Sequence, residues 1–303
     1  MEALINSCNA CPRCCNVKRY QENGLGFCGM GAMPKIARAA PHFWEEPCIS
    51  GTNGSGAIFF SGCVLKCVYC QNHDISKEGY GESITVQRLA EIYRELECQG
   101  VHNINLVNPT HFVEAIIQSL KIYRPLVPII YNCGGYESIE TINKLSGFID
   151  VYLPDIKYYD DKKARKYSGV PNYFEVASNA VIAMTEQTGS PEFDSDGLIK
   201  SGTIIRHLIL PGSTNDSISI LKWIDDNLSD KVLVSLMGQY TPQESCMVYN
   251  EINRRLTKRE YNKVQDFLFS TNLNGFVQDL SSADKQYIPQ FNLEGVKQGG
   301  IIK

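Results

Sequence analysis

From Gly56 onward, short apolar β-rich runs alternate with stretches of helical periodicity, and this alternation restricts the folds open to the chain. Almost wholly apolar strands are typical of a parallel sheet that is covered on both faces. Six predicted strand and helix pairs follow one another, over residues 57–61 and 86–99, 103–107 and 112–123, 129–132 and 138–145, 150–153 and 160–167, 204–210 and 218–228, and 232–236 and 257–268. The pattern predicts an α/β fold with a parallel sheet or barrel.

Local signals refine this organisation. Thr85 precedes one predicted helix, and Thr257 is followed three residues later by Glu260, which is the spacing of a capping box. Segment 185–200 mixes Gly, Ser, Pro and Asp, and predicts a surface loop or a helix-to-strand connection. Residues 1–50 are rich in Cys, Gly and Pro and lack long periodic segments. We therefore expect an N-terminal cysteine-rich region over 1–50, and a barrel with a C-terminal extension over 51–303.

Composition excludes several classes of protein. The chain has 303 residues, of which 43% are hydrophobic and 20% charged, as expected for a soluble globular protein with a large core. A net charge of -4 leaves no basic excess for binding duplex nucleic acid, and no apolar stretch approaches the roughly 20 residues of a membrane helix. The N-terminus has neither the basic nor the apolar segment of a secretory signal. We expect a cytoplasmic protein without a nucleic-acid or membrane partner.

Cysteine usage is the strongest chemical signal. The chain contains 12 cysteines, and a long chain without an export signal keeps its thiols reduced, so clustered cysteines indicate a metal rather than disulfides. We expect the isolated Cys48, Cys98, Cys133 and Cys246 to be small buried hydrophobes.

Directly after the first predicted strand, Cys63, Cys67 and Cys70 form a Cys-x3-Cys-x2-Cys motif. Thiolates at this spacing can surround one face of an iron-sulfur cubane, and three ligands for four irons leave one iron open for chemistry. A zinc site with a fourth ligand such as His73 is the alternative. The position favours the cluster, because the loops at the carboxyl ends of the strands carry the active sites of β/α barrels.

A second group of cysteines precedes the barrel, at Cys8, Cys11, Cys15 and Cys28, with a fifth thiol at Cys14. Four sulfurs suit tetrahedral zinc or an auxiliary iron-sulfur cluster, and either would replace apolar burial as the source of order. A metal-free reactive thiol pair is the third alternative. The spacing does not choose among them.

The three-cysteine motif, with the aromatic Tyr69 before its last cysteine, resembles the cluster motif of the radical S-adenosylmethionine (SAM) superfamily. The Gln71-Asn72 pair that follows resembles the glycyl-radical-activating branch, which includes the pyruvate formate-lyase activating enzyme. Stretches 11–13, 44–51, 59–63 and 102–107 are similar to an uncharacterised family related to that activase. The resemblance implies a partial (β/α)6 TIM-like barrel with an N-terminal cysteine-rich metal-binding extension.

The resemblance also implies cofactors and a reaction. Cys63, Cys67 and Cys70 would bind three irons of a [4Fe-4S] cluster, with SAM on the fourth. One electron, from a donor such as flavodoxin or ferredoxin, would cleave SAM to methionine and a 5′-deoxyadenosyl radical, which takes a hydrogen atom from the substrate. By likeness to the activases we expect a protein or peptide substrate; a small molecule is the alternative. A non-catalytic zinc-ribbon binding protein is the second alternative.

The related family carries cysteines at the positions of Cys8, Cys11, Cys15 and Cys28, but usually not at Cys14, so the resemblance assigns these four to the second metal. Within the three-cysteine motif, the resemblance also implies Tyr69 and Asn72 as cofactor contacts.

Polar residues after the predicted strands are further candidate SAM contacts. Where the superfamily usually has Gly-Gly-Glu after its second strand, this chain has Asn108-Pro109-Thr110-His111, so Asn108 and Thr110 are the candidates there. Gly134, followed by Gly135 and Glu137, lies one strand later, where the backbone either approaches the cofactor closely or simply turns.

The fourth and fifth predicted strands end in charged residues. Asp155 and Lys157 resemble the Asp-x-Lys of the activating enzymes, and residues two apart on a strand project to one face; a surface ion pair is the alternative. Arg206 resembles an arginine of those enzymes, and an arginine that points into an apolar barrel requires an anion such as the SAM carboxylate. His111 and Tyr240, just past strand ends, are weaker candidates for the substrate side.

Overall fold

The computed structural model describes residues 4–278, 280 and 289–297, and within them seven parallel strands form a curved sheet at the centre of the fold. Neighbouring strands are paired in register, for example Ile58 with Leu106 and Ile205 with Val234. The predicted α/β class with a parallel sheet is confirmed. In spatial order the parallel strands are β2 (Ser55–Phe60), β4 (Ile104–Val107), β5 (Ile129–Cys133), β6 (Val151–Pro154), β8 (Ile199–Leu208), β9 (Leu233–Met237) and β10 (Asn274–Val277).

Antiparallel strands extend this sheet at two places. Strand β1 (Lys35–His42) pairs with β2, and the short β3 (Glu82–Ser83) pairs with β1. A second short strand, β7 (Glu192–Phe193), pairs with β8. Because β1 belongs to the sheet, the sheet begins at Lys35, inside the region expected to form the cysteine-rich extension. We therefore define the cysteine-rich arm as residues 4–34.

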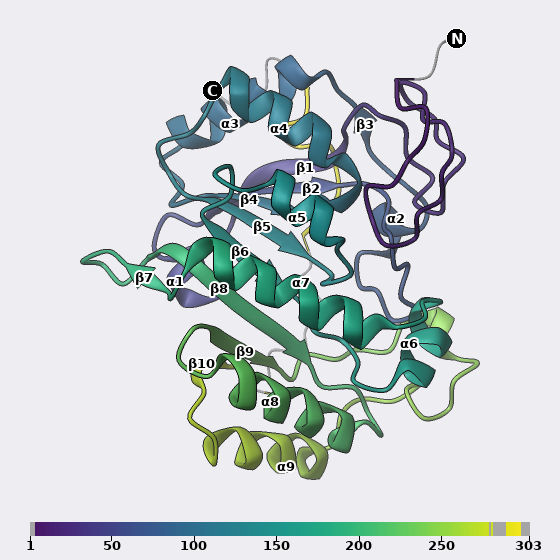
Figure 1. Ribbon diagram of the computed structural model, residues 1–303, viewed down its shortest axis with the longest axis vertical. Helices are drawn as coiled ribbons and strands as arrows, with labels where there is room; N and C mark the ends of the chain where they lie inside the picture. The colour runs from purple at the N-terminus through teal and green to yellow at the C-terminus, as the bar shows by residue number, and fades with distance from the viewer. Residues whose placement is uncertain (1–3, 279, 281–288, 298–303) are drawn as a thin grey trace.

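Helices cover the outer face of the sheet and follow the order of the strands (Figure 1). Thr85 caps the helix that follows β3, and Thr257 forms the predicted capping box with Glu260. The long helices are α3 (Val86–Cys98), α4 (Val113–Ile122), α5 (Ile139–Lys144), α6 (Asp161–Ser168), α7 (Tyr173–Thr188), α8 (Thr214–Leu228) and α9 (Lys258–Phe269). The short ones are α1 (Pro47–Ser50), α2 (His73–Ser76), and the 3-10 turns η1 (Thr110–Phe112) and η2 (Glu244–Cys246).

Helix α7 lies outside the six predicted strand and helix pairs. Segment 185–200 is a helix-to-strand connection, which was one of the two predictions for it, and it contains the end of α7, strand β7 and the beginning of β8. The long α7 completes the crossover from β6 to β8, and its buried residues Ala177, Ala180, Val181 and Met184 recur at helical spacing. Small residues weaken this signal in the sequence, because alanine does not mark an apolar face as leucine or isoleucine does.

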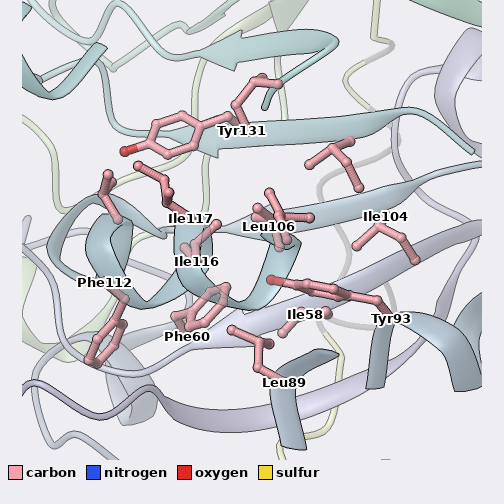
Figure 2. Close-up of a cluster of buried hydrophobic side chains, with 14 of the residues drawn as sticks. Ile58, Phe60, Leu89, Tyr93, Ile104, Leu106, Phe112, Ile116, Ile117 and Tyr131 are labelled. Carbon is pink, nitrogen blue, oxygen red and sulfur yellow. The ribbon is translucent and has the colours of Figure 1, made fainter. Parts of the chain in front are cut away.

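The largest apolar core lies between the sheet and the helices on its outer face (Figure 2). Ile58, Phe60 and Leu106 from the strands meet Leu89 and Ile116 from α3 and α4, and all five are almost wholly buried. Burial of an aliphatic or aromatic side chain contributes about 1.5–3 kcal/mol, so this layer fixes the positions of the strands.

The inner face of the sheet is divided into an apolar end and a polar end. On the inner face, Ile130, Val151 and Ile204 pack with Ile49 of α1 in one apolar cluster. Toward the carboxyl ends the inward side chains include Asn132, Asp155 and Arg206. The charged side chains Asp155 and Arg206 therefore lie toward the carboxyl end of the barrel.

The cysteine-rich arm contacts the sheet at its carboxyl end, beside α2 in Figure 1. Three β-bridges order it, one of which joins Ile5 to Arg19. Arg19 is only 2% exposed, and its guanidinium donates to the carbonyl oxygens of Met30 at 3.2 Å and His111 at 2.6 Å. A buried cation therefore fastens the arm to the turn that follows β4. Among the described residues, no helix is both long and apolar enough to cross a lipid bilayer.

Candidate active site

A cavity of about 170 Å³ lies at the carboxyl ends of β4, β5, β6 and β8 and brings the three-cysteine motif together with charged and amide side chains. Cys63, Cys67 and Cys70 come from the loop between β2 and α2, and the other polar residues come from strand ends far apart in sequence. The residues that line it include Cys63, Cys67, Cys70, Asn72, Asn108, Asn132, Cys133, Gly134, Asp155, Lys157 and Arg206.

Each of the three motif sulfurs accepts a hydrogen bond. The hydroxyl of Ser168 donates to Cys67 Sγ at 2.9 Å, and that of Ser76 donates to Cys70 Sγ at 3.3 Å. The backbone N–H of Leu65 donates to Cys63 Sγ at 3.3 Å. Donors aimed at sulfur stabilise a thiolate, which is the form that binds iron. Burial raises the pKa of the Cys63 thiol and raises that of the Cys70 thiol to about 11, so these two thiols need a cation to lose their protons.

A fourth cysteine, Cys133, also lines this cavity but has a different environment. Burial and the nearby Glu137 raise its pKa far above the ordinary range, and its thiol hydrogen-bonds to Glu137. A protonated, hydrogen-bonded thiol is a poor metal ligand. The donor set therefore fits a cluster held by three thiolates with one iron open to a further ligand. His73, the alternative zinc ligand, is exposed and pairs with Asp74 at 2.7 Å.

A buried chain of charges crosses the cavity wall. Lys157 pairs with Asp155, and Arg206 Nε donates to the other carboxylate oxygen of Asp155 at 2.9 Å. Burial tends to raise the pKa of Asp155, but the two cations hold it below its ordinary value, and the pKa values of both cations are raised. All three groups are therefore charged at neutral pH.

The guanidinium of Arg206 has further partners. Its Nη2 donates to Asn132 Oδ1 at 2.5 Å, and its Nη1 lies 3.3 Å from Glu45 Oε2. The anion that the sequence argument required for Arg206 is thus supplied by Asp155 and Glu45 of the chain itself.

Six of the predicted cofactor contacts lie in the wall of the cavity: Asn72, Asn108, Gly134, Asp155, Lys157 and Arg206. Asn108 adopts the left-handed conformation, with φ of 60°, and its amide donates to the carbonyl oxygen of Gly62. Gly135 is also left-handed, and a Cβ there would lie 2.1 Å from the carbonyl oxygen of Asp155. This close approach of two strand ends requires glycine.

The structure places the other predicted contacts away from the described wall of the cavity. Thr110 is fully buried and donates to Glu137 Oε1 at 2.6 Å. Tyr69 is 7% exposed and packs its ring against Tyr158 and Tyr240. These placements follow from hydrophobic burial and from the need of Glu137 for donors, neither of which the motif spacing reveals.

The two weaker candidates for the substrate side are also buried. His111 Nε2 hydrogen-bonds to the carbonyl oxygen of Ser61 at 2.7 Å, and burial lowers the pKa of His111 to about 3, so it is neutral. Tyr240 donates to the carbonyl oxygen of Ile252 at 2.7 Å. Both side chains pack in the protein interior, and neither is among the residues that line the cavity of the three-cysteine motif.

The four cysteines of the arm line one small cavity, of about 20 Å³, together with Arg19 and His111: Cys8, Cys11, Cys15 and Cys28. Cys14 is exposed and lies outside its lining. The four sulfur atoms are not all within 4.8 Å of one another. In the described part of the chain, the ligand atoms of His73, Asp74 and Glu78 are that close, and these three residues are exposed. Burial raises the pKa of Cys11 to about 12, so this thiol also needs a cation to ionise.

The arm and the three-cysteine loop touch through Arg13. Its guanidinium donates to the carbonyl oxygens of Val64, Ser168 and Gly169, and stacks on Phe27 with 3.4 Å between Cζ and the ring centroid. Val64 lies between Cys63 and Cys67 and also lines the cavity of the arm. The two groups of cysteines therefore share one structural support.

Several residues of this site were not predicted from the sequence. Tyr173, the first residue of α7, donates from its hydroxyl to the carbonyl oxygens of Gly134 at 2.8 Å and Asp155 at 2.9 Å. Glu45, Asn132 and Ser168 were also missed, and all four act through contacts distant in sequence. The adjacent acids Glu45-Glu46 beside Trp44 were the available signal for Glu45.

Comparisons of the sequence with a family model and with known proteins agree on one family. Residues 57–224, more than half of the chain, match the Radical SAM superfamily. An uncharacterized protein of Methanocaldococcus jannaschii is 28% identical over 281 residues, which cover 89% of this chain and 77% of that protein. The pyruvate formate-lyase-activating enzyme of Staphylococcus epidermidis is 26% identical over 179 residues, which cover 54% of this chain and 65% of that enzyme.

Among solved structures, a radical SAM methyltransferase from Sphaerobacter thermophilus superimposes with a TM-score of 0.50 at 12% identity. The superposition covers 73% of this chain and 65% of the methyltransferase. At this level of identity the similarity concerns the fold.

Proposed function

Because this chain belongs to the radical SAM superfamily, and is therefore an enzyme that works with a [4Fe-4S] cluster and SAM, we propose that Cys63, Cys67 and Cys70 hold the cluster. We propose further that the enzyme takes a hydrogen atom from a protein or peptide substrate. The observation that carries the assignment is the convergence of the three sulfurs on one cavity with Asp155 and Lys157. When bound, the reduced cluster supplies one electron that cleaves SAM into methionine and a 5′-deoxyadenosyl radical.

The chain's own residues bind and orient SAM. Its methionyl part carries an ammonium and a carboxylate, and the cavity wall carries a carboxylate and an ammonium to match, at Asp155 and Lys157. Gly134 has no side chain, so a ligand can approach its backbone closely. Asn72 and Asn108 offer amide groups as donors and acceptors.

Arg206 has two possible roles, and the contacts favour one. A bond from Arg206 to the SAM carboxylate requires Glu45, Asn132 or Asp155 to release the guanidinium. With these bonds in place, Arg206 is a positioning residue that holds the carboxylate of Asp155 toward the cavity. We therefore assign the ammonium of SAM to Asp155 and the carboxylate to Lys157.

Buried aromatic residues keep water away from this region. Tyr69, Tyr158, Tyr173 and Tyr240 belong to one apolar cluster with Cys67, and each is at most 7% exposed. A dry surrounding protects a carbon radical from side reactions and strengthens the electrostatic contacts of the cavity. Motif recognition placed Tyr69 on SAM, whereas its packing supports this shielding role.

A protein or peptide substrate is supported by the similarity to pyruvate formate-lyase-activating enzymes, whose matched part covers 54% of this chain. The substrate would lose a hydrogen atom to the 5′-deoxyadenosyl radical, which gives 5′-deoxyadenosine and a substrate radical. The electron that starts each turnover would come from a donor such as flavodoxin or ferredoxin, which must reach the cluster from outside.

For the arm, we propose a second metal bound by Cys8, Cys11, Cys15 and Cys28. Their convergence on one cavity supports this proposal, and so does Arg19, whose guanidinium lies 3.8 Å from Cys8 Sγ. Zinc and an auxiliary iron-sulfur cluster both suit four sulfurs, and metal analysis distinguishes them.

The decisive test is anaerobic purification followed by iron, sulfide and zinc analysis and a SAM cleavage assay with dithionite. We expect a brown protein that is bleached by dithionite and forms 5′-deoxyadenosine. A colourless protein with about two zinc ions and no SAM cleavage would show a non-catalytic zinc-ribbon protein instead. Four additional irons per chain would identify the metal of the arm as a second cluster, whereas one zinc would identify a structural site.

A further inference from the structure

A second and larger cavity, of about 560 Å³, adjoins the cluster cavity, and Arg206 lines both. Its walls are the loop between β1 and α1 on one side and β9, β10 and the residue after β10 on the other. This volume is in the range of small-ligand sites and accommodates one extended amino-acid side chain with its neighbours. A group bound here lies next to the site where the radical would form.

The charged residues that line this cavity are Glu45, Glu46 and Arg206, and two of them are paired with each other. Glu45 accepts from Asn105 at 3.1 Å as well as from Arg206, whose other nitrogens bind Asp155 and Asn132. The guanidinium of Arg206 therefore has no free edge for an anionic ligand.

Glu46 differs from its neighbour. It is only 8% exposed, Ser235 hydrogen-bonds to its carboxyl group, and its Oε2 atom has no hydrogen-bond partner. Burial raises the pKa of Glu46, because an apolar environment penalises the charged form of a carboxyl group. A buried carboxylate oxygen in a cavity wall lacks the donor it requires.

Gln278, on the opposite wall, has the same deficiency. Its amide nitrogen donates to Gln239 Oε1 at 3.1 Å, while its Oε1 atom is buried without a partner. Both unsatisfied atoms are oxygens, and a cation bound beside Glu46 favours the charged form of its carboxyl group. Phe43 and Phe276 also line the cavity, and aromatic rings attract cations. The complement of this lining is a group with several N–H donors and a positive charge.

We propose that this cavity binds the substrate and that Glu46 binds a protonated nitrogen group of it, an amine or a guanidinium. The inference rests on the proposed function, which makes the neighbouring cavity the source of the radical, and it specifies the substrate class. The cation belongs to a lysine or arginine side chain of a peptide, or to a free alkylamine. In either case, hydrogen abstraction occurs at a carbon near the bound nitrogen.

Binding of small probes to the reconstituted enzyme with SAM tests this proposal. The cationic probes are N-acetyl-lysinamide, N-acetyl-argininamide and 1,5-diaminopentane, and N-acetyl-norleucinamide is the neutral match for the lysine probe. We expect at least one cationic probe to bind about tenfold or more tightly than norleucinamide, since hydrogen bonds to charged groups are the stronger kind. A preference for the amino-acid amides points to a peptide, and a preference for the diamine points to a free amine.

The variant Glu46→Gln removes the charge at nearly constant shape. We expect it to weaken binding of the preferred cationic probe by about tenfold or more and to leave norleucinamide unchanged. Glu192→Gln, on the exposed strand β7, makes the same chemical change elsewhere and should have no effect. Thermal unfolding distinguishes binding from a structural role: losing a buried, incompletely paired carboxylate should leave the midpoint equal or higher, whereas a structural role predicts a lower one.

A second variant covers the case in which Glu46→Gln disturbs the fold. Gln278→Leu removes the other unsatisfied acceptor, and we expect it to weaken the cationic probes by about twofold to fivefold. Three outcomes would overturn the proposal. Norleucinamide could bind as tightly as the cationic probes, no cationic probe could show saturable binding, or both variants could bind the preferred cationic probe as tightly as the unmodified enzyme does. Probe binding without SAM cleavage would refute the proposed function alone, and SAM cleavage without probe selectivity would refute this inference alone.

Discussion

The hydroxyl of Ser168, the last residue of α6, donates a hydrogen bond of 2.9 Å to the sulfur of Cys67. The same hydroxyl also bonds with that of Tyr158, and the Ser168 carbonyl oxygen accepts from Arg13 of the arm. One serine thus contacts the loop of the three-cysteine motif, the buried tyrosines around Cys67 and the cysteine-rich arm. Its contacts connect the electronic properties of the proposed cluster to the docking of the arm.

Ser168→Ala should lower the reduction potential of the cluster. Hydrogen bonds to ligand sulfur stabilise the more negative reduced state, and their loss makes the cluster harder to reduce. A redox titration monitored by EPR measures the shift, and Ser178→Ala, a buried serine on α7 bonded to Glu175, is the control. A potential equal to that of the control variant would contradict the assigned role of Ser168.

Cys67→Ala should abolish SAM cleavage and lower the iron content, because the cluster would lose one of its three thiolate ligands. Formation of 5′-deoxyadenosine, followed by chromatography, should fall to background. The matched control is Cys98→Ala at the end of α3, which should retain full activity. Cys98 is exposed, so the expectation that it is a buried hydrophobe is wrong, whereas Cys48, Cys133 and Cys246 are buried as expected. Persistent turnover in the Cys67 variant would refute the cluster assignment.

Arg13→Ala should loosen the arm, because its guanidinium donates to three carbonyl oxygens beside the cluster loop. Each lost hydrogen bond costs about 1 kcal/mol, so we expect faster proteolysis of the arm and faster release of iron to a chelator. Lys18→Ala, at an exposed position of the same arm, should behave like the unmodified protein. Equal rates for both variants would show that the arm docks without Arg13.

The pH dependence of stability should reveal Glu137. Burial raises its pKa from 4.5 to about 7, so between these values the folded protein binds a proton that the unfolded chain has released. The free energy of unfolding therefore falls as pH rises through this window, by on the order of 3 kcal/mol in total.

Glu137→Gln should remove that dependence, because the amide does not titrate. Thermal midpoints measured from pH 5 to 8 should fall more steeply in the unmodified protein than in the variant. Parallel profiles would show that Glu137 does not titrate in this range. Glu140→Gln, an exposed neighbour on α5, controls for the change in net charge.

Arg206→Met should destabilise the protein by about 3–5 kcal/mol, because it leaves buried carboxylates with one cation fewer. Adding Glu45→Gln removes one of those carboxylates, and the double variant should recover at least about 1 kcal/mol. Unfolding midpoints of the single and double variants measure this coupling. Additive losses would show that Glu45 and Arg206 do not stabilise each other.

Much of the fold could be predicted because long apolar strands and amphipathic helices have periods that one sequence displays. The strands ending at Val107 and Cys133 and the caps at Thr85 and Thr257 are of this kind. Strand β1 could not be predicted in this way, because its position in the sheet depends on its pairing with β2 and not on its own pattern of residues. The same holds for α7, whose small residues hide its apolar face.

The residues of the candidate site also fall into a predictable and an unpredictable group. Asp155 and Lys157 were predictable because they follow a strand, and strand ends meet at one edge of a parallel sheet. Ser168, Tyr173 and Glu46 were not, because their importance lies in contacts with residues distant in sequence. Thr110 has the position of a cofactor contact, but the structure pairs it with Glu137, an acid on the neighbouring loop.

The contacts of Arg13 have a consequence for biosynthesis. The arm leaves the ribosome before the barrel, but its docking surface includes the carbonyl oxygens of Ser168 and Gly169, which are made about 150 residues later. At typical elongation rates of about 5–20 residues per second, the arm's thiols wait many seconds before they are covered. If the arm binds the proposed metal, its thiols must be kept reduced during that interval until the metal is delivered.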